Sequence, residues 1–214
     1  MSDKKVLEKK ALEEGHKYHH GDLRNALIEE GIKMINAGGE DALSLRKLAE
    51  KGGVSMAAPY AHFKSKEDMI NAIKEYVTES FSDYLEEAVS AVSENDIEKK
   101  IITLGNAYVR FFINNPEYFT FLFSRGYIHL SLDFNTSSAG TDDKAAAGNF
   151  KPFNILKDLC TVYFEQKKPG ISDYEKELEI IRIWASVQGL TSIVFMENVK
   201  WSRRWEDEII NLLK

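Results

Sequence analysis

The segment AAPYAHFKSK places a phenol, an imidazole and two ammonium groups at alternate positions: Tyr60, His62, Lys64 and Lys66. These groups donate hydrogen bonds, and such donors suit the phosphate oxygens of a nucleic acid backbone. Residues 56–58, Met-Ala-Ala, come before them, separated from Tyr60 by Pro59. Small side chains let a helix approach base edges closely, and an alanine methyl can contact the methyl group of thymine. The pattern indicates a DNA major groove flanked by phosphates.

Helix signals predict the elements that would position these residues. Ser44 is the expected N-cap of a short helix that ends at Gly52-Gly53, and Ser55 is the expected cap of a second short helix through about His62. Two short helices joined by KGGVS form a helix-turn-helix, whose second helix enters the major groove. A helix ending at Gly38-Gly39 precedes them. A long fourth helix with Ser65 as its N-cap follows, and Lys66 at its start favours an anion.

Helical periodicity also dominates the rest of the chain, and no segment shows a convincing strand pattern. Helices are expected from about residue 96 to the proline at 116, then at about 150–166, 173–198 and 203–213, with a short aromatic helical piece after the proline. Ser, Thr, Gly and Asp make residues 127–149 an expected loop. The chain is therefore predicted to be all-α, in two parts that share the long fourth helix.

Composition excludes several classes of protein. No apolar run is long enough to span a bilayer, and MSDKKVLEKKALEEG lacks the apolar core of a secretory signal, so a cytoplasmic protein is expected. Cys160 is the only cysteine, which excludes an internal disulfide and a zinc site built on paired cysteines. No phosphate loop, metal-ligand set or nucleophile motif appears, so we expect no enzyme, no metal and no cofactor. The net charge is −6, but residues 1–66 carry +2, which suggests that a polyanion meets the N-terminal part.

The segment Tyr18–Ile70 resembles the DNA-binding domain of the tetracycline-repressor (TetR) family of bacterial transcription regulators. The residues that match are LSLRKLAEKGGVSMAAPYAHFKSKEDMI, above all Gly53-Val54-Ser55, Tyr60, His62-Phe63 and Lys66-Glu67. The resemblance implies a charged arm at 1–16, a three-helix DNA-binding domain at 17–65, and a ligand-binding and dimerisation domain at 66–214. It also implies phosphate contacts from the first two helices. The expected DNA-binding residues are Ser44, Arg46, Ser55, Met56, Ala57, Ala58, Tyr60, His62, Lys64, Lys66, His19 and His20.

TetR relatives bind a small molecule inside the larger domain, and aromatic walls with few polar groups are typical of such pockets. The composition of the middle helices favours an apolar or aromatic effector. The expected lining residues are Tyr108, Arg110, Phe111, Phe119, Phe123, Tyr127, Cys160, Phe164, Trp184 and Gln188.

One helix-turn-helix covers a single half-site, so we expect a homodimer on a palindromic operator. The last two helices provide the expected interface, because apolar residues spread over more than one face of the segment 173–198. The expected interface residues are Ile183, Val187, Leu190, Thr191, Val194, Phe195, Trp205 and Ile209.

Two positions depart from patterns seen in the family. Trp184-Ala-Ser-Val-Gln188-Gly189 resembles a Trp-x-x-x-His-Gly signature of one TetR subgroup, but glutamine replaces the histidine. Pro59 stands where a leucine or similar residue is common. Because proline removes a backbone donor and disfavours helix in the residue before it, a distorted recognition helix is expected.

The sequence thus indicates a ligand-responsive regulator, expected to repress until its effector binds and to work on the nucleoid. A ligand-independent architectural DNA-binding protein is the alternative. A larger domain filled completely by its aromatic side chains would favour that alternative, whereas an enclosed void with an entrance would favour the sensor.

Overall fold

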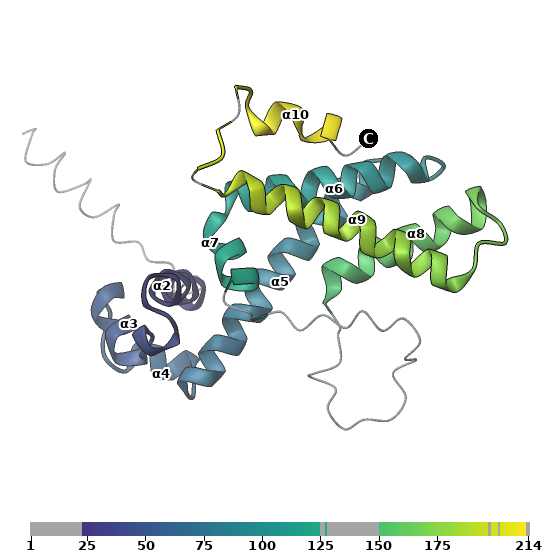
Figure 1. Cartoon of the computed structure of the whole chain (residues 1–214). Helices are drawn as coiled ribbons and strands as arrows, with labels where there is room; N and C mark the ends of the chain where they lie inside the picture. Colours follow the sequence, from purple (N-terminus) through teal and green to yellow (C-terminus); the bar gives the residue numbers. More distant parts are fainter. Residues whose placement is uncertain (1–22, 125–126, 128–149, 197, 201, 213–214) are drawn as a thin grey trace, which may run out of the picture. The chain divides into compact units, whose positions relative to one another are not determined.

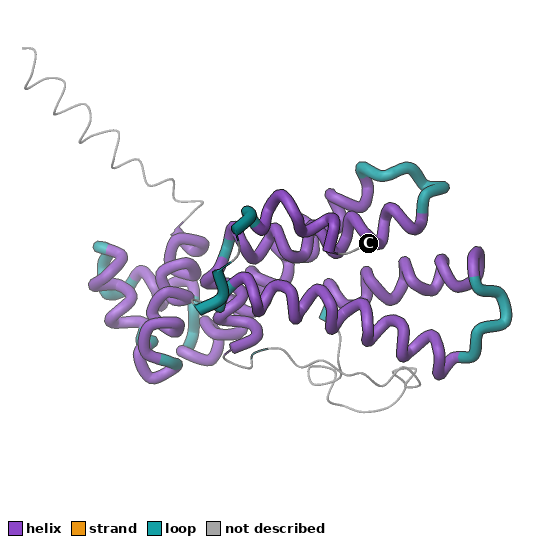
Figure 2. The backbone as a smooth tube through the Cα atoms, turned by 45° about the horizontal axis from the view of Figure 1, so that its top comes forward, coloured by secondary structure: helices purple, strands orange, loops and turns teal. Residues whose placement is uncertain are grey.

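The computed structural model of the chain describes residues 23–124, 127, 150–196, 198–200 and 202–212. All regular structure in these residues is helical (Figures 1 and 2). The chain divides into two compact units, residues 1–73 and 74–214. The dividing point lies inside the long helix α5 (Lys66–Ser90), eight residues after the boundary expected from the sequence. This helix therefore contributes residues to both units.

The first unit packs α2 (Leu23–Gly38), η1 (Glu40–Ala42), α3 (Leu45–Gly52) and α4 (Ala58–His62) around the start of α5. Leucine and isoleucine side chains from α2, together with Leu48, Phe63 and Met69, are almost completely buried. Gly31 lies where α2 meets α5: a Cβ atom there would come 2.5 Å from the Met69 Cε atom and 3.0 Å from the Ile73 Cδ1 atom. The missing side chain permits this close helix crossing.

A left-handed glycine closes α3 and starts the turn to α4. Gly53 has φ +63°, its N–H donates to the Glu50 carbonyl, and the next N–H, of Val54, donates to the Ala49 carbonyl. This pair of bonds is the Schellman arrangement that satisfies the last carbonyls of a helix. At the other end of α3, the Ser44 Oγ atom accepts from the Lys47 N–H, which confirms the predicted cap.

The second unit contains α6 (Ile97–Asn114), α7 (Pro116–Phe119), the π-helical turn η2 (Thr120–Ser124), α8 (Lys151–Lys167), α9 (Asp173–Val194) and α10 (Trp205–Leu212). Helix α6 packs against both α8 and α9, which form an antiparallel hairpin (Figure 1). Buried phenylalanine and tyrosine side chains of α5, α6, α7 and η2 form the core of this unit. Of the expected loop 127–149, only Tyr127 is among the described residues.

Two helix bounds differ from the sequence prediction. The α9 helix ends at Val194, before the predicted end near residue 198. Helix α4 begins at Ala58, so Ser55, Met56 and Ala57 belong to the turn that precedes it. Helix α9 begins with a full capping box: Ser172 Oγ accepts from the Glu175 N–H, and the Glu175 carboxylate accepts from the Ser172 N–H.

Candidate nucleic-acid interface and ligand site

The short helix α4 begins three residues later than Ser55, the cap predicted from the sequence. The N-cap residue is Ala57, which makes no side-chain cap bond, and the Ala58 N–H donates to the Ser55 carbonyl. The prediction of Ser55 as N-cap is therefore wrong. The reason is Pro59: it occupies the first turn of the helix, where no N–H is needed, and its ring is buried. The sequence suggested that Pro59 distorts the recognition helix, whereas in the structure Pro59 lies in the first turn of α4.

Met56 and Ala57, predicted to approach bases, and Tyr60, predicted to contact phosphate, are presented to solvent, whereas Ala58 is half-buried. Met56 is 49% exposed, Tyr60 is 58% exposed, and Ala57 is also exposed. Met56 and Ala57 extend from the turn, whereas Tyr60 extends from the helix itself. The Phe63 ring, directly after α4, is buried and fixes the C-terminal end of the helix in the core. The Phe63 backbone N–H donates to the Pro59 carbonyl. A rigid, short element therefore carries a mixed apolar and phenolic surface.

Donor groups continue from α4 into the start of α5. His62 and Lys64 are exposed, and Lys66 is half-buried. The Asp68 carboxylate accepts from the Lys64 N–H at 2.8 Å, while Ser65 Oγ accepts from the Asp68 N–H, so the backbone between the two lysines is fixed. These two bonds confirm Ser65 as the N-cap of α5.

The positive end of α5 is already partly occupied. The pKa of Glu67 is lowered by hydrogen bonds from the Glu67 backbone N–H and from the Ser65 side chain. Glu67 is therefore an anion at the start of α5, in the region where Lys66 was expected to favour a phosphate. Any electrostatic attraction of a DNA phosphate to this end of α5 must therefore come from Lys66, and the negative charge of Glu67 opposes it.

The α3 residues predicted to contact phosphate are also at the surface. Ser44 uses its oxygen as a cap, which leaves the hydroxyl proton available to donate. Arg46 is exposed and its Nε atom donates to the Glu50 carboxylate at 3.3 Å. His19 and His20 lie outside the described residues. Arg24 of α2, which the sequence did not indicate, lies with its guanidinium carbon 5.8 Å from the Phe63 ring centroid. No local sequence pattern links two residues so far apart in the chain.

Several predicted lining residues meet inside the second unit. The Tyr108 ring packs edge-on against the Trp184 ring, with centroids 5.3 Å apart, and the Tyr108 hydroxyl donates to Gln188 Oε1. Burial raises the pKa of Tyr108 well above its ordinary value. Around this pair, Phe111, Phe119 and Phe123 belong to the same cluster of ring contacts.

The remaining lining predictions have mixed outcomes. Cys160 and Phe164 are buried in α8. Tyr127 stacks on Phe121 and lies beneath the Lys74 ammonium. Arg110 is exposed and its Nε atom donates to the Asn106 side chain, so it does not line the interior. Its position on α6 places it on the face away from the buried Val109 and Phe112.

The space beside Tyr108 is small. A cavity of about 20 Å³ lies there, and its lining residues come from α5, α6, α8 and α9: Leu85, Ile101, Leu104, Gly105, Tyr108, Pro152, Leu156, Ile183, Trp184 and Val187. Ligand pockets usually measure about 300–1,000 Å³. The space beside Tyr108 is therefore filled almost completely by the surrounding side chains in this conformation.

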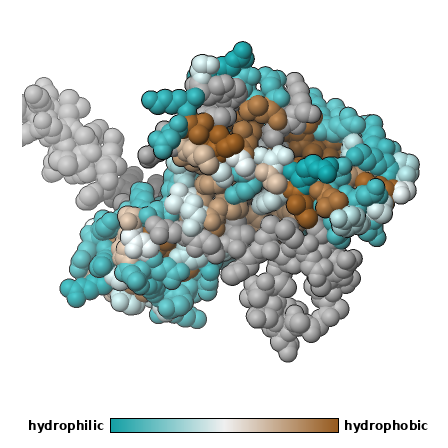
Figure 3. All heavy atoms as spheres, in the orientation of Figure 1, coloured by the Kyte–Doolittle hydropathy of each residue, from teal (hydrophilic) through white to brown (hydrophobic). Residues whose placement is uncertain are grey.

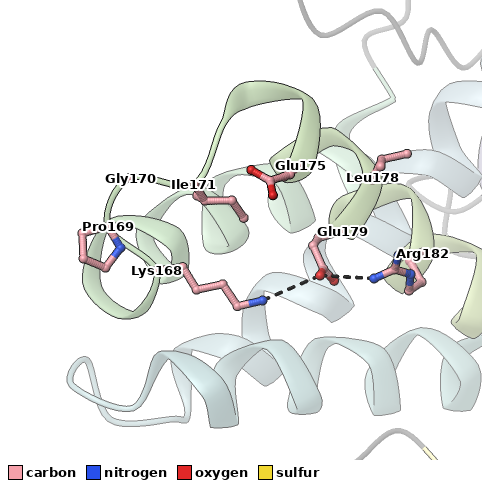
Figure 4. Close-up of a pocket in the computed structure, with 8 residues that line it drawn as sticks. All are labelled: Lys168, Pro169, Gly170, Ile171, Glu175, Leu178, Glu179 and Arg182. Atoms are coloured by element: carbon pink, nitrogen blue, oxygen red, sulfur yellow. Dashed lines mark ion pairs between the residues drawn. The ribbon is translucent and has the colours of Figure 1, made fainter.

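A larger hollow of about 580 Å³ is an open groove at the turn between α8 and α9 (Figure 4). None of the predicted lining residues contributes to it. Glu179 pairs with both Lys168, at 3.7 Å, and Arg182, at 3.1 Å. Because the charged groups are paired with one another and the groove is open to solvent, it has little to hold a ligand.

The predicted interface residues are not all at the surface. Val187 and Thr191 of α9 and Ile209 of α10 are buried within the second unit, so they cannot form an interface. The exposed side of α9 carries Tyr174, Leu178 and Ile193, and Met196 is exposed just after the helix. Hydrophobic residues interrupt the polar surface along this helix (Figure 3). Ile183, Leu190, Val194 and Phe195 are half-buried. The side chain of Trp205 is outside the description.

Residues 27–73 match the family model described as bacterial regulatory proteins, tetR family. The helix-turn-helix segment is therefore similar to the DNA-binding domain of that family. The chain is 31% identical over 83 residues to the tetracycline repressor protein class A from transposon 1721 of Escherichia coli, and this match covers 39% of the chain but only 36% of that repressor.

Solved structures share the fold over a greater length. A protein of unknown function from Rhodococcus sp. RHA1 is 22% identical, with a TM-score of 0.63 over 92% of this chain and 93% of the other. The transcriptional regulator FadR from Bacillus subtilis, solved in complex with stearoyl-CoA, is 16% identical, with a TM-score of 0.62 over 87% and 95%. The described residues of this chain therefore share the all-α fold of these solved structures. In the described residues, no helix is long and apolar enough to cross a membrane and no group of side chains could hold a metal ion.

Proposed function

We propose that this protein is a one-component transcriptional regulator that binds double-stranded DNA as a homodimer. The observation that carries the proposal is the geometry of α4 and the turn before it. Met56 and Ala57 are exposed in the turn that follows Gly53, Tyr60 is exposed on the helix, and His62 and Lys64 follow. Apolar and aromatic groups on a major-groove helix contact base edges, and the donors beside them bind phosphates. The protein acts on the bacterial nucleoid.

The proposal is tested by measuring binding of the full-length protein to duplex DNA by fluorescence anisotropy. Tyr60→Ala and Lys66→Ala are each expected to weaken binding about tenfold, equal to about 1.4 kcal/mol. Tyr60→Phe removes only the hydroxyl, so its affinity shows how much of the effect comes from the hydroxyl and how much from the ring. Lys99→Ala removes an equal charge from an exposed position of α6 and is expected to leave binding unchanged. Equal binding by all variants would contradict the assignment of α4 as the DNA-contacting element.

A two-fold dimer follows from the single half-site that one helix-turn-helix covers. The exposed side of α9 is the proposed interface. Tyr174, Leu178 and Ile193 are large apolar side chains on that side, with Met196 exposed just past the helix end. Ala185 and Gly189 lie between them and permit close approach of a second helix. A Cβ atom added at Gly189 meets nothing within 4 Å in the protomer. The palindromic operator is a consequence of this symmetry.

Regulation by a small apolar effector is part of the proposal, with repression relieved by binding. The fold relative FadR was solved with stearoyl-CoA. The second unit has an apolar aromatic interior in which the buried Tyr108 donates to the half-buried Gln188. The small cavity sets a condition: Trp184 or a neighbouring ring must move before a ligand enters. The filled conformation is then the one that an effector must displace, which reduces its apparent affinity.

The same small cavity supports a second candidate, an architectural DNA-binding protein without a ligand. Trp184 fluorescence and the thermal midpoint separate the two. Stearoyl-CoA, free stearate and an aromatic carboxylate are titrated in turn into the protein and its DNA complex. A raised midpoint together with release of DNA supports the sensor. No change with any of these ligands, with DNA binding intact, supports the architectural protein.

A further inference from the structure

Arg24 is a cation of the first unit that is held by an aromatic ring. Its guanidinium carbon lies 5.8 Å from the centroid of Phe63, and the side chain is exposed. Among the described residues, no carboxylate lies within ion-pair distance of Arg24. In contrast, Lys33 and Lys51 both pair with Glu30. Arg24 thus differs from its neighbours in having donors that no described carboxylate occupies.

The ring that holds Arg24 belongs to the recognition element. Phe63 directly follows α4 and is only 1% exposed, so the position of its ring is fixed by the core. A guanidinium over a ring face keeps its N–H groups directed outward in its own plane, where they can bind two oxygens of one phosphate. Arginine suits this arrangement better than lysine because its donors form a rigid fork.

Two further candidate phosphate-binding residues flank Phe63 in the chain. His62, the last residue of α4, is exposed, and its ring centroid lies 6.2 Å from that of Phe63. Lys64 follows, with its backbone held by Asp68. Phe63 therefore contacts one cation from α2 and the imidazole at the end of α4, and Lys64 follows it directly in the chain. The residues that match the family model begin at position 27, after Arg24.

We propose that Arg24 binds a backbone phosphate beside the recognition helix and that the Phe63 ring positions it. This inference rests on the proposed DNA binding of the first unit. A phosphate contact carries no sequence information, so Arg24 contributes equally on any duplex. It also releases counterions, which makes its contribution visible as a dependence of affinity on salt concentration.

The experiment measures the affinity of the full-length protein for a random-sequence duplex across a salt series. Each lost phosphate contact reduces the slope of log affinity against log salt by about 0.9. Arg24→Gln is therefore expected to have a shallower slope, so that its affinity falls about 3.5-fold less than that of the parent between about 50 and about 200 mM salt. Arg24→Lys keeps the charge and is expected to keep the slope, with weaker binding.

The matched control is Lys33→Gln, which removes the same charge from α2. Lys33 lies about two and a half turns further along, on the opposite side of the helix. For Lys33→Gln, the slope of log affinity against log salt is expected to equal that of the parent. Circular dichroism and thermal midpoints show whether each variant is folded.

Equal slopes for Arg24→Gln, Lys33→Gln and the parent would overturn the role of Arg24. If Tyr60→Ala still weakened binding in that case, the proposed function would stand without this contact. If the folded parent bound no DNA at any salt concentration, both the proposed function and the role of Arg24 would fall.

Discussion

At Gly53 a single residue determines how the two helices of the candidate interface are joined. The sequence predicted that the pair Gly52-Gly53 ends α3, and the structure shows that the two glycines have different roles. Gly53 has φ +63°, whereas Gly52 is the last residue of the helix. Either glycine could have been the left-handed one, because that choice depends on where the helical bonds stop. The turn was thus predictable from the sequence, but the role of each glycine was not.

Gly53→Ala is expected to reduce the free energy of unfolding by about 1–2 kcal/mol, the cost of a left-handed conformation for an L-residue. Nothing lies within 4 Å of the added Cβ atom, so the cost is conformational and not steric. Gly52→Ala is the matched control. Its Cβ atom makes ordinary contacts, at 3.8 Å from Leu27 Cδ2, and it is expected to be neutral or to stabilise α3. Urea denaturation of both variants measures the difference, and equal destabilisation would contradict this account.

Cys160 gives a residue-scale prediction about pH. Burial, and then the charge of Glu179, raises the pKa of its thiol from 9.0 to about 12. The unfolded chain therefore loses this proton at lower pH than the folded protein. The contribution to stability is full below pH 9.0 and is lost as the pH rises toward 12.

Between about pH 8 and about pH 10.5, this linkage is expected to remove about 2 kcal/mol of stability from the parent. Cys160→Ala lacks it, so the urea midpoints of the two proteins should converge as the pH rises. Parallel midpoints across the same interval would show that the thiol titrates alike in the folded and unfolded states.

At the scale of elements, α4 and α9 show what periodicity could not determine. The extent of α4 depends on Pro59, whose burial in the first turn fixes the start of the helix. In α9, apolar residues occur on most sides, so the sequence did not indicate which side the protomer covers. The structure buries Ile180, Val187 and Thr191 and leaves the opposite side exposed. Burial of Val187 required packing against α6 and α8, which are distant in sequence.

If α9 forms the dimer interface, one charge added to its exposed apolar side is expected to prevent dimer formation. Ala185→Arg adds a long cation in the middle of the exposed apolar side and is expected to convert the dimer to a monomer. Ala91→Arg adds the same charge at an exposed alanine after α5 and is expected to leave the dimer intact. Sedimentation velocity distinguishes the two masses. A dimer that persists in Ala185→Arg would place the interface elsewhere.

At the scale of the whole molecule, the all-α class, the helix-turn-helix and the aromatic interior could all be predicted from residue types and spacing. Whether that interior is open could not, because close packing depends on contacts between distant segments such as Tyr108 with Trp184 and Phe153 with Trp184. The exposed position of Arg110 also follows from the rotation of α6 and not from its charge. The filled interior makes effector binding a matter of conformational change.

The central claim is that α4 reads a DNA sequence within a two-fold dimer. The most direct measurement is selection of bound duplexes from a random pool by the full-length protein, repeated with Tyr60→Ala. We expect a palindromic site for the parent and loss or broad weakening of that site for the variant. Recovery of duplexes with no common sequence, bound only at low salt, would contradict sequence-specific regulation and favour an architectural role.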